Sequence, residues 1–369
     1  MASAFSFSFA GDDIDDDGQL DVAPVVSPTS NAETSTSAAA ATANAFPVQG
    51  KPLLPPVRHE LDHLMSRLPS KIAYSTLSIG LDDGHTISIP RRELWDVRVQ
   101  LMAEEEDPSD AAPGLGQHDV KTGIYEGGFK SWESSVDLVK VLASQNIGLN
   151  LDAGPFVSIE LGCGTALPSL AIFRWALDGR TFGKKLPLSL VLADYNPTVL
   201  YLVTLPNFLL TWALQQRGEL VVLDDAFTSD GELELSAEVL DAFKESLSAN
   251  QISLSFLSGG WSPEFVEQLY TSVTRQDAAN TLVMGAETIY SPFALESFVA
   301  TLHSILDRER QQRPNGDAYA IIAAKRLYFG VGGSLDDFVD KMKSLGATVE
   351  TLREEAEGVR RGVVRCSFS

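Results

Sequence analysis

Cysteine and histidine are scarce in this sequence: its 369 residues include two cysteines and five histidines. Cys163 and Cys366 cannot build a disulfide scaffold, and so few cysteines fit a reducing compartment. We therefore expect the protein in the cytoplasm, with the nucleus as a further location. His59 and His63 have i, i+4 spacing, but a solvated helix face explains this pair better than zinc does. We predict no metal site.

Long hydrophobic runs are also missing. No apolar stretch approaches the ~20 residues that cross a bilayer, and the chain does not begin with a basic segment followed by an apolar one. We therefore predict neither a membrane segment nor a signal peptide. The sequence shows no heptad repeat and no long exposed apolar stripe, which favours a monomer.

Basic residues are few, and the formal net charge is −22. Residues 1–50 hold seven acidic residues and residues 101–119 hold six, and neither segment contains Lys or Arg. Such a charge repels nucleic acid, so we predict no direct sequence-specific nucleic-acid binding. The acidic segments would suit a basic protein partner, although solubility alone explains them equally well.

Composition divides the chain into three parts. Residues 1–50, rich in Ala, Ser, Thr and Asp and with aromatic alternation at Phe5–Phe9, are expected to be disordered because they bury too little apolar surface. Residues 51–119 form a predicted extension, and residues 120–369 a predicted α/β domain. The patterns in the extension predict a helix at 57–67, a hairpin of strands 72–81 and 86–90, a strand at 95–102 and an acidic loop at 104–116.

Strand and helix patterns alternate from residue 156 onward, after a predicted helix at 136–144. Alternation predicts a mostly parallel sheet with helices on both faces, and the last two strands, joined by a loop alone, must be antiparallel. We therefore predict a Rossmann-like sheet of seven strands with a final antiparallel hairpin. The strands are expected at 156–161, 188–194, 252–257, 281–287, 319–325, 347–352 and 363–368, and the helices at 167–177, 197–216, 261–274, 292–309 and 335–345.

A glycine turn follows the first of these strands. The apolar run 157–161 contains Glu160 and leads into Gly162 and Gly164, which let the backbone approach a ligand. The next strand ends in Asp194, and a carboxylate there can accept both hydroxyls of a ribose. This pair predicts a cofactor with an adenosine. Leu167 and Pro168 depart from the dinucleotide fingerprint, which disfavours a dehydrogenase.

The glycine turn resembles the first motif of class I S-adenosylmethionine-dependent methyltransferases, whose seven-stranded sheet the predicted elements fit. Further blocks resemble the histidine protein methyltransferases, a branch of the methyltransferase-16-like protein methylases, and suggest a fungal member. The resemblance covers roughly residues 120–369 and the extreme N-terminus. Its blocks are Phe5–Asp13, Lys130–Glu133, Glu160–Gly164, Asp194–Pro197, Val203–Asn207, Ser258–Ser262, Ala286–Ser291 and Lys325–Gly333.

The resemblance implies S-adenosylmethionine as cofactor and a role for each block. The lid over the methionine part would be Ser131, Trp132, Glu133, Ser134 and Ser135. Trp132 and Trp261 also suit ordinary core aromatics, and Asp194 also suits a helix N-cap before Pro197. The remaining cofactor residues are Glu160, Gly162 and Gly164 at the methionine end, Asp194 at the ribose, Tyr195, Asn196, Gly260 and Trp261 around the adenine, and Ala286.

Glu287 and Tyr290 are the predicted catalytic residues, since they follow the fourth strand at the edge where open α/β sheets place their chemistry. Methyl transfer is an in-line displacement that needs a neutral nucleophile close to the methyl group and no water. Histidine, with a reference pKa of ~6.5, is mostly neutral at pH 7, whereas deprotonating lysine costs about 4.6 kcal/mol. Glu287 could therefore act by accepting one imidazole N–H and selecting the tautomer, although a buried structural acid is the simpler interpretation.

The resemblance implies a histidine of a large-subunit ribosomal protein as the target, and some relatives methylate themselves. Two alternatives remain open. One is a lysine methyltransferase on the same scaffold, although the lysine-modifying relatives more often have Asp where Glu287 stands. The other is a non-catalytic adaptor that binds a ribosomal or chaperone partner through its acidic segments, which intact cofactor motifs argue against.

Overall fold

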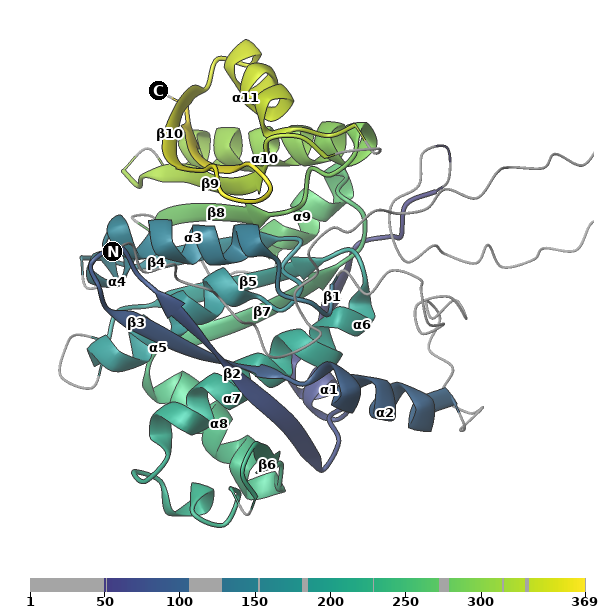
Figure 1. Cartoon of the computed structure of the whole chain (residues 1–369), viewed down its shortest axis with the longest axis vertical. Coiled ribbons are helices and arrows are strands. Elements are labelled where there is room, and N and C mark those ends of the chain that lie inside the picture. The colour runs from purple at the N-terminus through teal and green to yellow at the C-terminus, as the bar shows by residue number, and fades with distance from the viewer. Residues whose placement is uncertain are drawn as a thin grey trace, which may run out of the picture.

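The structure is a computed structural model, in which a large mixed sheet carries helices on both faces (Figure 1). The predicted disordered tail, the Phe5–Phe9 patch, most of the acidic loop and residues 329–331 lie outside the described residues. The described residues are 50, 52–105, 128–151, 153–180, 185–227, 229–271, 279–313, 315–328 and 332–368.

Within the described residues the main sheet has eight strands, one more than the sequence predicts. Five neighbouring strands, from β7 to β9, are parallel, and β11 is antiparallel to both β9 and β10, which confirms the final hairpin. The additional strand is β1, which pairs antiparallel with the outer edge of β7. In spatial order the strands are β1 (Val57–His59), β7 (Ile252–Ser258), β5 (Leu188–Asp194), β4 (Phe156–Leu161), β8 (Asn280–Ala286), β9 (Ala318–Lys325), β11 (Arg361–Ser367) and β10 (Thr348–Glu355).

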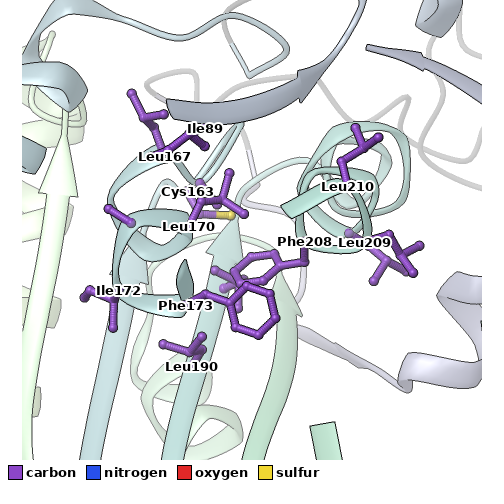
Figure 2. Packing of buried hydrophobic residues seen from close by; sticks show 14 of the residues in the cluster. Ile89, Cys163, Leu167, Leu170, Ile172, Phe173, Leu190, Phe208, Leu209 and Leu210 are labelled. Carbon is purple, nitrogen blue, oxygen red and sulfur yellow. The ribbon is translucent and has the colours of Figure 1, made fainter. Parts of the chain in front are cut away.

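Two hydrophobic clusters cover the two faces of this sheet. Successive strand residues point to opposite faces, so Leu190 and Leu192 belong to one cluster and Val191 and Ala193 to the other. Figure 2 shows the first cluster, where Phe173 packs against Phe208 with their ring centroids 5.1 Å apart. Its helices are α1 (Leu61–Met65), α2 (Leu94–Glu105), α3 (Glu133–Ser144), α4 (Ile147–Asn150), α5 (Leu167–Arg180), α7 (Leu205–Gln216) and α8 (Ala237–Ala249), and those of the second are α9 (Pro263–Thr271), α10 (Pro292–Gln312) and α11 (Leu335–Ser344).

A second, three-stranded sheet joins the extension to the α/β domain. Its order is β3 (Thr86–Arg92), β2 (Lys71–Gly80) and β6 (Glu232–Glu234), so β2 of the predicted extension pairs with a strand from the middle of the chain. The predicted hairpin is confirmed. Because β1 also joins the main sheet, the extension folds together with the α/β domain.

Two predictions in the extension are wrong. The predicted strand at 95–102 is helix α2, because burying Leu94, Val97 and Leu101 on one face outweighs the alternating pattern and its β-branched residues. The predicted helix at 57–67 divides into β1 and α1, because the free edge of β7 offers backbone partners to Val57–His59. The sequence patterns also did not predict β6, α8 or the short helical turn η3 (Val221–Leu223), although Ser236 caps α8 and its buried residues Val239, Phe243 and Leu247 have helical spacing.

The predicted helix at 197–216 is confirmed and contains a π-helical turn. It comprises α6 (Pro197–Val199), the π turn η2 (Leu200–Thr204) and α7. The carbonyl of Leu202 in this turn accepts a hydrogen bond from Nη1 of the buried Arg92 at 2.9 Å. In length and composition this helix could cross a membrane, contrary to the prediction from apolar runs, but 89% of its most apolar stretch is buried inside the protein.

Candidate active site

A pocket opens at the carboxyl ends of β4, β5 and β8, where parallel sheets place their ligands. About 1000 Å³ of space lies between its walls and in the solvent at its mouth. Most of the predicted site residues line it: Trp132, Ser135, Glu160, Gly162, Gly164, Asp194, Tyr195, Asn196, Trp261, Ala286, Glu287 and Tyr290. The remaining wall residues were not predicted: Gly128, Phe129, Lys130, Cys163, Thr165, Leu167, Val199, Thr288 and Ala294.

The glycine turn after β4 requires glycine at two positions. Gly162 has φ +71°, and a Cβ atom there would lie 2.6 Å from Cγ2 of Thr288. Gly164 has φ +50°, and a Cβ atom there would lie 3.1 Å from the carbonyl oxygen of Gly128. A side chain at either position would be strained and would press on the pocket wall.

Two residues of the Val203–Asn207 block support this turn, a role that the sequence did not reveal. Thr204 donates a hydrogen bond from its hydroxyl to the Gly164 carbonyl at 2.7 Å, and Asn207 donates from Nδ2 to the Thr165 carbonyl at 3.0 Å. Oδ1 of Asn207 in turn accepts from the backbone N–H of Arg92 at 2.7 Å. The block therefore connects the turn to the N-terminal hairpin.

Asp194 ends β5 with its carboxylate facing the glycine turn. Its Oδ2 accepts from the N–H of Gly164 and its Oδ1 from the N–H of Asn196, both at 3.0 Å. Burial raises the pKa of Asp194 to about 6, although the backbone hydrogen bonds oppose this shift. The cap of α6 is Asn196, whose side chain accepts from the N–H of Thr198 at 3.1 Å, so Asp194 does not cap that helix.

Glu160 is the second-last residue of β4 and lies deeper in the pocket. It is 2% exposed, and its Oε2 accepts from the N–H of Ser169 at 3.1 Å and from the hydroxyl of the same residue. Burial raises the pKa of Glu160 to about 8. A cationic group in the pocket would favour the ionised form of this carboxyl group.

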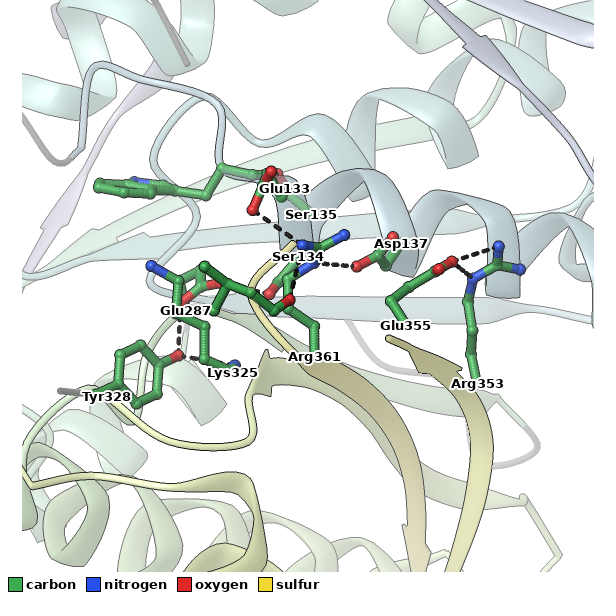
Figure 3. A network of polar contacts seen from close by, with 12 residues as sticks. Glu133, Ser134, Ser135, Asp137, Glu287, Lys325, Tyr328, Arg353, Glu355 and Arg361 are labelled. Carbon is green, nitrogen blue, oxygen red and sulfur yellow. Dashed lines mark hydrogen bonds and ion pairs between the residues drawn. The ribbon is translucent and has the colours of Figure 1, made fainter. Parts of the chain in front are cut away.

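Four predicted cofactor residues lie behind the pocket wall. The hydroxyl of Ser131 is 2.9 Å from that of Thr165, and Glu133 turns away to form an ion pair with Arg361 at 3.0 Å. Ser134 donates a hydrogen bond to Glu287 (Figure 3). Gly260 packs against the N-terminal segment, since a Cβ atom there would lie 2.6 Å from Cβ of Leu53.

Glu287 follows β8 rather than ending it, because its φ of +57° breaks the strand after Ala286. Ser134 donates to its Oε1, and Tyr328 donates from its hydroxyl to Oε2 at 2.5 Å (Figure 3). Burial raises the pKa of Glu287, while these two hydrogen bonds and the positive charges of Lys325 and Arg361 oppose the rise. The pocket therefore contains a half-buried carboxyl group with one hydrogen-bond donor on each oxygen.

The loops after β8 and β9 are packed closely together. A Cβ atom on Gly333 would lie 2.1 Å from the carbonyl oxygen of Ile289. Tyr328 lies in this second loop, and Tyr290 lies in the first. The close packing holds Tyr328 beside Glu287, a contact that neither motif predicts on its own.

The pocket fits S-adenosylmethionine. Gly162 and Gly164 line the pocket without a side chain, which lets the backbone approach a ligand, and Asp194 offers a carboxylate beside them. Trp132 and Trp261 supply apolar walls. Thr288 lies on the pocket wall beside the turn, with Cγ2 towards Gly162. In the described part of the chain, no three His, Cys, Asp or Glu side chains gather as a metal ion would need.

Sequence comparisons with known proteins identify the family to which this chain belongs. No family model matches the sequence. The chain is 34% identical over 325 residues to histidine protein methyltransferase 1 of Schizosaccharomyces pombe, covering 85% of this chain and 87% of the relative. It is 35% identical over 300 residues to the protein of the same name from Saccharomyces cerevisiae, covering 74% of this chain and 75% of the relative.

A solved structure of the N-terminal domain of human METTL16 in complex with SAH is 10% identical, with a TM-score of 0.35 over 79% of this chain and 88% of that domain. This likeness is too weak to add to the assignment. The two fungal relatives cover most of this chain and of their own length, which is sufficient to assign a family. The chain therefore belongs to the histidine protein methyltransferase 1 family, and is an S-adenosylmethionine-dependent protein histidine methyltransferase.

Proposed function

We propose that this enzyme methylates a histidine of a basic protein of the large ribosomal subunit. Two observations support the target class. The resemblance of the motif blocks implies it, and a net charge of −22 favours a basic partner over nucleic acid. A cytoplasmic and nuclear location belongs to the same proposal, as does a monomeric enzyme.

Glu287 is the residue that we propose acts on the target imidazole. Each of its oxygens already accepts one hydrogen bond and retains a second lone pair, so the carboxylate can also accept from the N–H of a target imidazole. That contact would leave the other ring nitrogen with a free lone pair. Bound S-adenosylmethionine would supply an electrophilic methyl group. Tyr290, on the wall beside Glu287, would help to position the ring and exclude water.

Lys325 favours histidine over lysine as the target. Its Nζ lies 5.6 Å from the ring centroid of Trp132 and 5.8 Å from that of Tyr328, and its charge acts on Glu287. A target ammonium at Glu287 would be repelled by the charge of Lys325, whereas a neutral imidazole would not. Lysine would in addition have to lose its proton before it could attack.

Label transfer to purified large ribosomal subunits tests the target. The subunits are incubated with enzyme and S-adenosylmethionine labelled in the methyl group, and the labelled protein is hydrolysed and its amino acids separated. We expect label in methylhistidine, lost with Asp194→Ala. Label in methyllysine would support the lysine alternative, and no label despite measured cofactor binding would count against a ribosomal substrate.

Substitution of Glu287 tests the chemistry. We expect Glu287→Gln to lower kcat about tenfold to a hundredfold with little change in cofactor affinity, because the neutral amide is a weaker acceptor for the ring N–H. Glu296→Gln, which alters an exposed acid in an ion pair with Lys341, is the matched control. Full activity of both Glu287→Gln and Glu287→Ala, with normal cofactor affinity, would exclude this role.

A further inference from the structure

Residues 52–56, the strap, cross the end of β7 beside the predicted adenine side of the pocket. The carbonyl of Leu54 accepts a hydrogen bond from the N–H of Gly260 at 2.8 Å. The N–H of Leu54 donates to the hydroxyl of Tyr195, a pocket residue, at 3.2 Å. A single strap residue therefore binds both the turn after β7 and the side chain of Tyr195.

The two glycines that follow β7 allow this close approach. A Cβ atom on Gly259 would lie 2.4 Å from the carbonyl oxygen of Pro55, and Gly259 has φ +109°. A Cβ atom on Gly260 would lie 2.6 Å from Cβ of Leu53. Gly260, which the resemblance placed at the adenine wall, and its neighbour Gly259 accommodate protein backbone and side chain.

The same junction contacts the turn that carries Asp194. The N–H of Gly259 lies 3.1 Å from the carbonyl oxygen of Asp194 and 3.2 Å from that of Tyr195. Downstream, β1 holds the strap in place, since Val57 pairs with Ser258 and Nε2 of His59 lies 2.7 Å from Oγ of Ser258. The strap is therefore fixed at one end and bonded to a pocket side chain at its centre.

We propose that the strap is a positioning element of the cofactor site: Leu54 fixes the Tyr195 ring for contact with the adenine, so the N-terminal extension takes part in S-adenosylmethionine binding. The inference rests on the proposed placement of the adenine beside Tyr195. Position 260 must then be glycine because the strap occupies the space beside it. Residues 52–56 should affect cofactor affinity rather than the chemical step.

A set of full-length variants tests this proposal. Gly260→Ala pushes the strap away, and Leu53→Gly in the same chain removes the atoms that the new methyl group would meet. We expect Gly260→Ala to raise the KM for S-adenosylmethionine and the Kd for S-adenosylhomocysteine about tenfold, while kcat and the KM for the protein substrate stay nearly unchanged. Adding Leu53→Gly should restore most of the lost cofactor affinity. Gly80→Ala, where a Cβ atom meets nothing within 4 Å, is the matched control.

Tyr195→Phe completes the test as a double-mutant cycle. Alone it should weaken S-adenosylhomocysteine binding about threefold to tenfold, and together with Gly260→Ala it should add little, because the displaced strap no longer reaches the hydroxyl. Additive effects, or a loss in kcat or in thermal stability with unchanged cofactor affinity, would overturn the strap's role. If Asp194→Ala also leaves cofactor affinity unchanged, the proposed cofactor site itself is wrong; if only Asp194→Ala weakens binding, the strap inference alone fails.

Discussion

The two halves of the pocket hold their carboxylates in different ways. In the cofactor half, after β4 and β5, Asp194 accepts from backbone N–H groups 30 and 2 residues away in sequence. In the target half, after β8 and β9, Glu287 accepts from the side chains of Ser134 and Tyr328, which are 153 and 41 residues away. The first arrangement depends on backbone groups at the ends of two paired strands, and the second on side chains that tertiary packing brings together.

This difference affects what a substitution can do in each half. Every residue except proline carries a backbone N–H, so the cofactor half depends mainly on the glycines that allow the turn and on the acid itself. The target half depends on particular hydroxyl groups delivered by α3 and by the loop after β9. Its geometry can therefore be changed without altering Glu287.

Removing the acid of the cofactor half should have the largest effect. We expect Asp194→Ala to raise the Kd for S-adenosylhomocysteine at least about 100-fold, because it removes a carboxylate whose charge-assisted hydrogen bonds contribute about 1.5–3 kcal/mol each. Isothermal titration calorimetry measures this change. Asp317→Ala, at an exposed ion pair with Arg365, should bind normally. Equal affinity of both variants would contradict a role for Asp194 in the cofactor site.

Gly162→Ala tests the contact between the halves, because the new methyl group would meet Thr288. We expect the free energy of unfolding to fall by about 2–3 kcal/mol, from the close contact and from an alanine at positive φ, and cofactor binding to weaken about tenfold. Thr288→Ser removes Cγ2 and should restore part of the stability in the double variant. Chemical denaturation would measure the free energy of unfolding of both variants. If the double variant is no more stable than Gly162→Ala, backbone strain alone explains the lost stability.

Low pH should weaken cofactor binding through Asp194. Its carboxylate must be ionised to accept two hydroxyls, and its pKa is raised by burial to about 6. The affinity for S-adenosylhomocysteine should therefore fall about tenfold for each pH unit below 6. Isothermal titration calorimetry between pH 5 and 8 would measure the affinity, with Asp194→Ala as control. An affinity that does not change with pH would contradict the role of the Asp194 carboxylate.

The free energy of unfolding of the cofactor-free protein should change in the opposite direction. Because the pKa of Asp194 is higher in the folded than in the unfolded state, this group should make the folded protein more stable as the pH falls through 6.

Tyr328→Phe should have the smallest effect, confined to the target half. We expect turnover to fall about threefold to tenfold, with cofactor affinity unchanged, because Glu287 loses one of its two hydrogen bonds. That bond lowers the pKa of Glu287, so its loss should raise this pKa and move the acidic limb of the pH–rate profile to higher pH. An unshifted profile would show that Tyr328 acts only in packing.

Much of the α/β domain could be predicted from the sequence. The alternating strand and helix patterns predicted every parallel strand of the main sheet and the final hairpin, because their signals are local periodicities. The extension was harder: α2 carries a strand-like alternation, and β1 is too short to show a period. Both depend on what the rest of the chain buries or leaves unpaired.

The sequence by itself determined the main parts of the cofactor half, because Gly162 and Gly164 form a local turn after one strand and Asp194 ends the next strand of a predicted parallel pair. Only the tertiary structure decided that Tyr328 and Ser134 hold Glu287, and that the strap occupies the space beside Gly260. The physical reason is distance along the chain. A turn is specified by neighbouring residues, whereas a hydrogen bond between side chains far apart in sequence exists only after packing brings their elements together.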